Sequence, residues 1–334
     1  MPITATPDKI DATTLGNYHK CRRYHHWHHN LGWAREGYQG PLVHGKAFHA
    51  GLARWYESHS LDEAINDLRA AWPHSEGVPG DQIPGDQIPI EIDHYALPRC
   101  EALFKGYVAY WNGGQGAAQD PLSAYAPPGQ QPLLEHIIEC PITTLAQRYV
   151  PGEPWHTSPW TYFGIVDMIA ELDGQLYIVD HKTCSEMGES FSRKWKPDIQ
   201  MLGYVVLAET TLGLDRPITG ALINGAKMTK FVGGAKGMVF PPEKAANIEY
   251  RRVPIFYTQA EKAQWVRDRI EERRELEWHY ETGVWPAAGR DACSAYGGCQ
   301  FRDVCGSSPG DWATRLASDF KPGQHWNPLG VERI

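Results

Sequence analysis

The sequence predicts a mixed α/β fold in which a central sheet is flanked by helices. Helical patterns of apolar residues dominate residues 1–132, strand patterns dominate 133–182, and strands then alternate with helices up to residue 282. Elements in this order bury their apolar faces by packing helices against a sheet. We therefore expect one domain, 1–334, with a helical N-terminal part (1–132), a core (133–282) and a cysteine-containing C-terminal region (283–334).

The N-terminal part is predicted to contain four helices and two loops. Apolar residues recur at helical spacing, for example at Val43, Ala47 and Leu52. Ser60 with Glu63 forms a capping-box pattern that opens a helix, which should end before the next proline. The predicted helices are 15–33, 43–58, the one after Ser60 and 95–111, and the predicted loops are 73–93, with its repeated Gly-Asp-Gln-Ile-Pro, and 112–132.

A hairpin lies at the centre of the predicted core. Apolar residues dominate 160–171 and 175–182, and the intervening Asp173-Gly174 is a turn dipeptide. A second capping box, Thr258 with Glu261, begins a long helix. Besides the hairpin, the predicted elements are strands 133–143, 217–226 and 248–257 and helices 198–212, which opens next to Pro197, and 258–281, followed by an irregular tail after Trp285.

Composition and net charge limit the classes of protein to which the chain can belong. Hydrophobic residues make up 42% and charged residues 22%, and the net charge is −8, which argues against a generally basic nucleic-acid-binding surface. The chain has no run of about eighteen apolar residues and no secretory signal pattern, so we expect a cytoplasmic protein (host cytoplasm if viral) without a membrane partner. Four basic clusters could contact phosphate or form solvated surface: Arg22/Arg23, Arg193/Lys194/Lys196, Lys227/Lys230 and Arg251/Arg252.

Two aspartates and a lysine are placed together by the predicted hairpin. Pairing about its turn puts Asp167 and Asp180 roughly opposite one another, and alternation puts Asp180 and Lys182 on one face of their strand. Two carboxylates can hold Mg²⁺ or Mn²⁺, which activates a bound water and neutralises charge on a phosphate. A nearby lysine can orient that water. The pattern predicts metal-dependent phosphodiester hydrolysis; the alternative is a salt bridge between Asp180 and Lys182.

These residues belong to a longer series of motifs. In chain order the series is Gly45-x-x-x-His49, Leu134-Glu135 to Pro141, Gly164-x-x-Asp167, Asp180-x-Lys182 and Gln200-x-x-x-Tyr204. The residue types and their order resemble the RecB-like branch of the PD-(D/E)XK nucleases, a branch that also includes CRISPR-associated nucleases. The resemblance spans residues 45–204. It implies a restriction-endonuclease-like core, in which a central mixed sheet is flanked by helices.

The resemblance implies a metal site and a catalytic lysine. His49, Asp167 and Asp180 would ligate Mg²⁺ or Mn²⁺, together with the backbone carbonyl of His181. Lys182 would assist the attacking water. Taken alone, His49 could instead be a helix histidine with a structural hydrogen bond.

Three further residues complete the implied site. Gln200 and Tyr204 lie one helical turn apart and would line the site and contact DNA; taken alone, they could be packing residues. Glu135 is a further candidate, for whose role Glu139 competes.

The function implied by the resemblance is that of a metal-dependent DNA exonuclease, acting on single strands or DNA ends in recombination, repair or replication. Two alternatives use the same residues: a CRISPR-adaptation nuclease, and a non-catalytic DNA-binding scaffold that keeps the fold. No G-x-x-x-x-G-K-[S/T] motif occurs, so the chain is not itself a motor. DNA is the expected ligand, and a helicase or recombination protein is an expected partner.

Seven cysteines suggest a second metal site. Cys293, Cys299 and Cys305 are evenly spaced, and the C-x-F-R-x-x-C ending resembles iron–sulfur members of the same branch, as does the sequence around Cys21. The resemblance implies a [4Fe-4S] cluster that holds the two terminal segments together. The alternative is Zn²⁺ on the same thiolates, although the C-x2-C pairs common in zinc sites are missing from the sequence. Of the other cysteines, Cys100 and Cys140 are expected to be buried and Cys184 to lie near the site.

Overall fold

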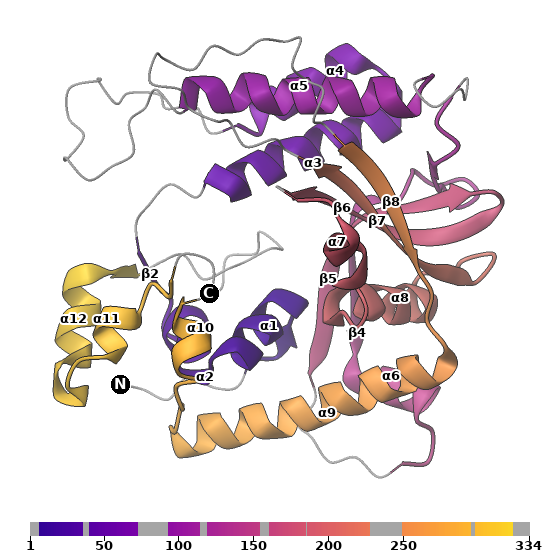
Figure 1. Ribbon diagram of the computed structural model, residues 1–334. Coiled ribbons are helices and arrows are strands. Elements are labelled where there is room, and N and C mark those ends of the chain that lie inside the picture. Colours follow the sequence, from indigo (N-terminus) through magenta and orange to yellow (C-terminus); the bar gives the residue numbers. More distant parts are fainter. Residues whose placement is uncertain are drawn as a thin grey trace.

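A central sheet lies between two layers of helices in the computed structural model, which describes residues 7–35, 40–72, 93–113, 119–153, 160–184, 186–227, 249–294 and 298–322 (Figure 1). The predicted fold class is confirmed. The strands are β1 Lys9–Ile10, β2 Trp33–Ala34, β3 Ser123–Ala124, β4 Leu134–Pro141, β5 Thr161–Leu172, β6 Gln175–Cys184, β7 Ile218–Lys227, β8 Glu249–Ile255 and β9 Lys321–Pro322.

The helices fall into an N-terminal, a central and a C-terminal group. They are α1 Ala12–Lys20, α2 Arg22–His25, the π-helix His26–Asn30, α3 Gly40–Ser58, α4 Leu61–Ala70, α5 Asp93–Trp111, α6 Ile142–Tyr149, α7 Glu189–Arg193, α8 Ile199–Thr211, α9 Gln259–Thr282, α10 Arg290–Ser294, α11 Arg302–Cys305, the 3₁₀-helix Pro309–Asp311 and α12 Trp312–Asp319. Among the described residues, no helix is long and apolar enough to cross a membrane.

The seven-stranded sheet is mixed, with the strand order β1-β5-β6-β7-β8 and with β3 and β4 also paired to β5. β5 and β6 form the predicted hairpin, in register from Leu172↔Gln175 to Met168↔Val179. The turn residues Asp173 and Gly174 both have positive φ, 51° and 75°. A two-residue loop of this kind matches the twist of the flanking strands. β6 then pairs in parallel with β7 through the crossover helix α8.

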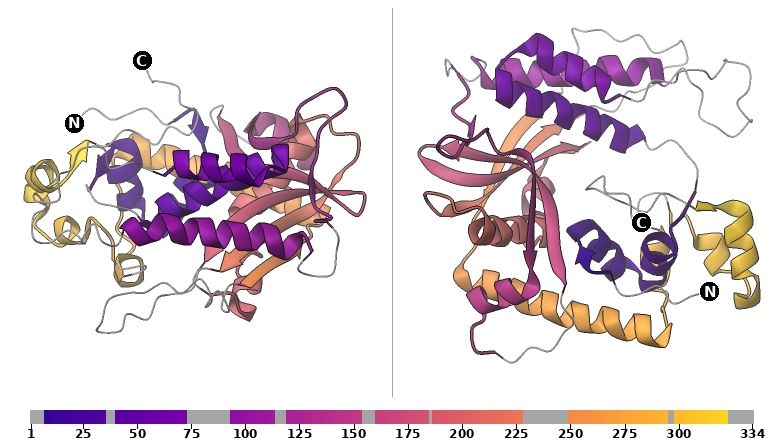
Figure 2. Two further views of the ribbon diagram at one scale, coloured as in Figure 1. Left: turned by 90° about the horizontal axis from the view of Figure 1, so that it is seen from above. Right: turned by 180° about the vertical axis from the view of Figure 1, so that it is seen from behind.

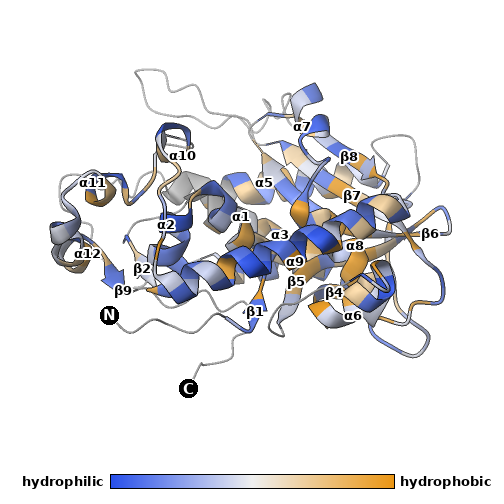
Figure 3. Cartoon of the chain, turned by 90° about the horizontal axis from the view of Figure 1, so that it is seen from below, coloured by the Kyte–Doolittle hydropathy of each residue, from blue (hydrophilic) through white to orange (hydrophobic). Residues whose placement is uncertain are grey.

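Both faces of the sheet are buried against helices. Val179 belongs to an apolar cluster formed with residues of α3, α4 and α5, whereas its neighbour Ile178 belongs to a second cluster formed with residues of α1, α6, α8 and α9. The run Leu176–His181 of β6 is therefore buried throughout, as expected for a strand covered on both sides. α8 packs against both the sheet and α9, and most of its residues are buried. α9 carries many hydrophilic residues (Figure 3).

The segment from α2 to β2 lies beside the segment from α10 to β9 (Figure 2). Trp27 of the π-helix is buried with Phe301, which precedes α11, and with Val304 and Leu316 from α11 and α12. β2 pairs antiparallel with β9, at Trp33↔Pro322. An apolar cluster and a small sheet therefore join the terminal segments.

Several predicted boundaries need correction. The expected helix 15–33 is interrupted at Cys21, whose extended backbone (φ −166°, ψ 116°) ends α1 and precedes α2. The expected strand 133–143 ends at Pro141, which cannot donate a ladder hydrogen bond, and α6 begins directly after it. The tail after Trp285, expected to be irregular, contains α10, α11 and α12. The repeat within the predicted loop 73–93 lies outside the described residues.

Candidate metal and catalytic site

The two strands of the central hairpin separate at Asp167 and Asp180. The last backbone pair is Met168↔Val179, so the next opposed residues would be Asp167 and Asp180. Instead of continuing the ladder, the backbone N–H of His181 donates to Oδ2 of Asp167 at 2.6 Å. A buried N–H needs a partner, and this side chain supplies it. The Asp167 carboxylate is thus held at the point where β5 and β6 separate.

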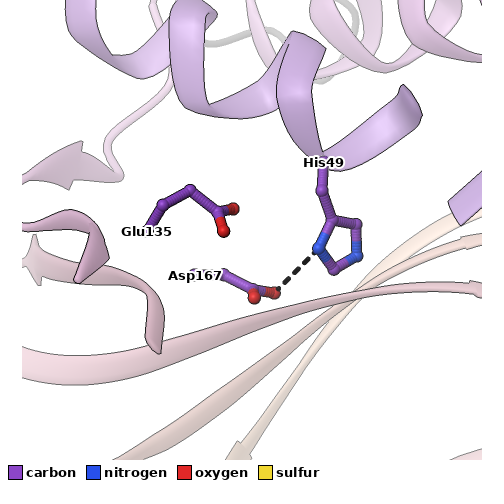
Figure 4. A group of neighbouring side chains, drawn as sticks. All are labelled: His49, Glu135 and Asp167. Carbon is purple, nitrogen blue, oxygen red and sulfur yellow. Dashed lines mark ion pairs between the residues drawn. The ribbon is translucent and has the colours of Figure 1, made fainter. Parts of the chain in front are cut away.

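Asp167 meets two side chains from other elements (Figure 4). His49 comes from α3 and Glu135 from β4, and one ligand atom from each of the three residues lies within 4.8 Å of the others. The Nδ1 atom of His49 is 3.5 Å from Oδ2 of Asp167. Glu139, the competing candidate, instead forms an ion pair with Lys9. We call His49, Glu135 and Asp167 the metal group.

Glu135 reaches this group through an irregular backbone. The β4–β5 register passes from Leu134↔Met168 to His136↔Val166 and omits the pair between Glu135 and Asp167. Glu135 has φ 44°, in the left-handed region. This conformation costs about 1 kcal/mol for a residue with a β-carbon, and such strain is concentrated at functional sites.

The metal group fits a hard divalent cation. Two carboxylates and an imidazole suit Mg²⁺ or Mn²⁺. Burial lowers the pKa of His49, but the Asp167 carboxylate outweighs this effect and raises the pKa to about 9. Burial raises the pKa of Asp167, but the charge and hydrogen bond of His49, together with the charge of Lys182, outweigh this effect and hold the pKa below its usual range. A cation that binds here must displace the imidazole proton, so its affinity should increase with pH.

The charge of Asp167 also acts on Glu135. Although Glu135 is exposed overall, partial desolvation raises the pKa of its carboxyl group to about 7, and the negative charge of Asp167 adds to the shift. Adjacent carboxylates repel one another unless a cation lies between them. This repulsion is what a bound divalent ion would relieve.

Asp180 and Lys182 share one face of β6, as alternation predicted. The Nζ atom of Lys182 lies 2.6 Å from Oδ2 of Asp180, so the salt bridge considered as the alternative is present. Burial raises the pKa of Asp180 to about 6, against the effect of the Lys182 charge. Asp180 does not join the metal group, although its charge acts on His49. The structure therefore brings together His49, Glu135 and Asp167 as one set and Asp180 with Lys182 as another.

His181 points away from Lys182, toward α3. Its Nδ1 atom is 2.8 Å from Nδ2 of Asn224, and its ring lies edge-on to that of His49 at 5.8 Å. Burial lowers the pKa of His181 to about 3, so the ring is neutral at physiological pH. The implied metal contact of the His181 backbone carbonyl stays a prediction.

A buried hydrogen-bonded network continues from Asn224 and was missed by sequence reasoning. Asn224 donates to the hydroxyl of Tyr107, which also accepts from Arg252. The Arg252 guanidinium donates two hydrogen bonds to Asp120, at 2.7 and 2.6 Å, and one to Tyr56 at 3.1 Å. The network supports the segment between Asp180 and Lys182 from the α3 side of the sheet.

The basic cluster Arg251/Arg252 is therefore not a phosphate-binding surface. Arg252 is buried with Asp120, with 9% and 5% of their side chains exposed. Arg251 pairs with Glu249 at 2.6 Å. The sequence signal that could have identified this arrangement is weak, because Asp120 lies 132 residues away in a glycine- and proline-rich stretch.

Gln200 and Tyr204 lie together on α8, and the amide of Gln200 donates to the Tyr204 hydroxyl at 2.9 Å. The ring of Tyr204 lies against Gly164, where a β-carbon would be 2.2 Å from Cε1 of the tyrosine. This close approach explains the glycine of the Gly164-x-x-Asp167 motif. Burial raises the pKa of Tyr204, and the charges of Asp180 and Asp167 contribute, which places the ring near both aspartates.

The four cysteines of the expected cluster are not gathered at a common ligand distance. Within the described residues, the metal group is the one set of three or more candidate ligands that meets the 4.8 Å limit. Burial raises the pKa of Cys299, and the charges of Cys293 and Cys21 add to this effect. The guanidinium of Arg23 donates to Sγ of Cys305 at 3.0 Å. These thiols share a region of the fold, but their geometry does not fit a preformed metal site.

The other three cysteines carry no metal-site geometry. Cys100 and Cys140 are buried, as expected. Cys184 is half-buried at the end of β6, two residues beyond Lys182.

Comparisons with known proteins identify the family. A family model described as the PD-(D/E)XK nuclease superfamily matches residues 10–306. A search of curated proteins found no match. The matched range contains the metal group, Asp180 with Lys182, and the helix with Gln200 and Tyr204. The chain belongs to the PD-(D/E)XK nuclease superfamily.

Proposed function

We propose that the protein is a metal-dependent deoxyribonuclease of the RecB-like branch, which degrades single-stranded DNA or DNA from its ends in recombination, repair or replication. The observation that carries this proposal is the metal group of His49, Glu135 and Asp167 beside Lys182. The order of the motifs from Gly45 to Tyr204 favours the RecB-like branch. The superfamily itself implies phosphodiester hydrolysis.

The site residues have separate proposed roles. His49, Glu135 and Asp167 would hold Mg²⁺ or Mn²⁺, which when bound supplies Lewis-acid stabilisation and lowers the pKa of a water. Asp180 fixes the Lys182 ammonium by its ion pair, 2.6 Å long, and could turn to join the metal ligands together with the His181 carbonyl. Lys182 keeps its proton, because burial lowers its pKa but the charges of Asp180 and Asp167 and the hydrogen bond to Asp180 together outweigh that effect. Its ammonium group can therefore orient the attacking water and offset negative charge on the phosphate.

Gln200 and Tyr204 are proposed to position the substrate strand. The Tyr204 hydroxyl accepts from Gln200 and can donate in turn, and the ring is fixed against Gly164. A rigid donor of this kind, near both aspartates, suits contact with a phosphate oxygen. The tight packing against Gly164 keeps that hydroxyl in one place.

The functional test compares linear with covalently closed single-stranded DNA. We expect degradation of the end-labelled linear strand with Mg²⁺ or Mn²⁺, protection of the circle, and loss of activity in EDTA that either ion restores. Cleavage of both substrates at equal rates would contradict the exonuclease proposal while leaving the nuclease intact. Cleavage restricted to short protruding ends would favour the spacer-trimming alternative. Binding without cleavage under all these conditions would favour the scaffold alternative.

Two further proposals concern architecture and partners. We propose that residues 1–334 act as one nuclease domain, because β1 pairs with β5 and α1 packs with α8 in one apolar core. The chain has no motor motif of its own, so a helicase or recombination protein remains our proposed partner.

A cluster on Cys21, Cys293, Cys299 and Cys305 stays a proposal that rests on the resemblance alone. The electrostatic influence of Cys21 and Cys293 on Cys299 is compatible with it, but the thiols would have to move closer to bind one [4Fe-4S] group. Anaerobically purified protein should then contain iron and absorb in the visible range, and Cys299→Ser should lose both. Zinc in place of iron would favour the zinc alternative, and protein free of both metals would exclude the proposal.

A further inference from the structure

The segment after β6 is anchored directly beside Lys182. Gly225 of β7 is the register partner of Lys182. A β-carbon at Gly225 would lie 2.8 Å from Cζ of Phe191 on α7, so this ring packs closely over the strand. Phe191 and Trp195 are both buried. Two aromatic anchors therefore fix α7 and the turn after it against the end of β6 that carries Lys182.

This anchored segment holds a second cation near the site. The Nζ atom of Lys182 is 6.0 Å from the centre of the Trp195 ring. The Nζ atom of Lys194 is 4.4 Å from the centre of the same ring. Both ammonium groups thus lie near one indole, and the attraction between a cation and an aromatic face keeps Lys194 in place.

Lys194 differs from its basic neighbours in what it contacts. Arg193 forms an ion pair with Glu189 on the same helix. Lys196 pairs with Glu261 at 2.9 Å and donates to the backbone carbonyl of residue 256. In the part of the chain that the structure describes, the Lys194 side chain contacts the rings of Phe191 and Trp195 and has no carboxylate partner. Because Lys194 is also exposed, its charge is available to a ligand.

We propose that Lys194 binds a backbone phosphate of the substrate strand, next to the phosphate that is cleaved. The inference rests on the proposed nuclease function and adds a second contact between the protein and the substrate strand. The chain has a net charge of −8 and an acidic metal group, so a polyanion must be held by local cations. Lys194 supplies such a cation at the same indole ring, that of Trp195, which Lys182 also approaches.

The first test measures binding of a fluorescein-labelled oligothymidylate in EDTA, where no cleavage occurs. Lys194→Met keeps the aliphatic stem over the rings but removes the charge. Binding should weaken about 5-fold at physiological ionic strength. The slope of log K against the logarithm of the salt concentration should become less negative by about 0.7. Lys194→Arg should restore both quantities. The matched control is Lys105→Met, which removes another exposed charge, on α5 across the sheet.

The second test locates the contact along the strand. One phosphate at a time is replaced by an uncharged methylphosphonate, and binding by wild type and Lys194→Met is compared. Binding by wild type should be weakened most at one position, where Lys194→Met should be insensitive, and that position should be adjacent to the one at which Lys182→Ala is insensitive. Additive losses at every position, or equal binding by Lys194→Met and wild type, would overturn the inference. Because these measurements do not use cleavage, a protein that binds as expected but cuts nothing would refute the proposed function instead.

Discussion

Replacing Lys182 with alanine is expected to slow DNA cleavage by at least about 100-fold, since a positioned proton donor or cation contributes about 10²- to 10⁴-fold. The ammonium group of Lys182 is half-buried and held by Asp180 at 2.6 Å. Among the described residues, Lys194 approaches the same Trp195 ring but forms no ion pair with Asp180, so it does not replace the ammonium that Asp180 holds. Single-turnover cleavage of an end-labelled strand at saturating Mn²⁺ measures the effect.

Two controls separate this effect from misfolding. Lys105→Ala removes a lysine that pairs with Glu101 on α5 and should cleave at the wild-type rate. The circular dichroism of Lys182→Ala should match that of wild type, since one side of a strand-end ion pair is lost. Cleavage by Lys182→Ala within a few-fold of wild type would remove the lysine from the proposed mechanism.

Replacing Arg252 with methionine is expected to lower the free energy of unfolding by about 3–5 kcal/mol, the usual effect of breaking a buried ion pair. The variant leaves the Asp120 carboxylate buried without its two guanidinium hydrogen bonds. It also removes a donor to the hydroxyls of Tyr56 and Tyr107. Urea denaturation followed by tryptophan fluorescence measures the change.

The adjacent arginine provides a matched control for burial. Arg251 pairs with Glu249, and 40% and 35% of these two side chains are exposed. Exposed ion pairs contribute about 0–1 kcal/mol, so Arg251→Met should change stability by no more than that. If both variants lowered the free energy of unfolding equally, burial of the Arg252–Asp120 ion pair would not determine its contribution to stability.

The hairpin was predictable because its signals are local. Asp173-Gly174 has the two positive φ values that a two-residue turn requires, and this turn fixes the register of both strands. Once the register is fixed, alternation places Asp180 and Lys182 on one face. The capping patterns at Ser60 and Thr258 were equally local, and each hydroxyl accepts from the expected backbone N–H. The reciprocal bond to the glutamate side chain, which completes a capping box, forms at Thr258, whereas the N–H of Ser60 donates to Ser58.

The choice between Glu135 and Glu139 could not be made from the sequence. Both residues lie on β4, and regular alternation gives them the same face. The structure separates them through the positive φ of Glu135 and through the ion pair of Glu139 with Lys9, which is 130 residues away. Neither the irregular backbone nor the distant ion-pair partner can be predicted from the neighbouring residues in the sequence.

Arg252 shows a second limit of local reasoning. Because charged residues are mostly exposed, the adjacent Arg251 and Arg252 are predicted from the sequence to form a basic surface. Its burial depends on Asp120, Tyr56 and Tyr107, which reach it from three other segments of the chain. The same limit applies to Cys21, where sequence predicted a continuous helix and the structure has a break.

The most direct test of the metal group is Mn²⁺ binding, followed by the electron paramagnetic resonance signal of the free ion. Glu135→Gln should weaken binding by more than about 10-fold, since ligand-shell changes have at least this effect. Glu139→Gln, which removes a carboxylate from the same strand, should bind Mn²⁺ as wild type does. Equal affinity of wild type and Glu135→Gln, or equal weakening by the two variants, would contradict the assignment of His49, Glu135 and Asp167 as the metal site.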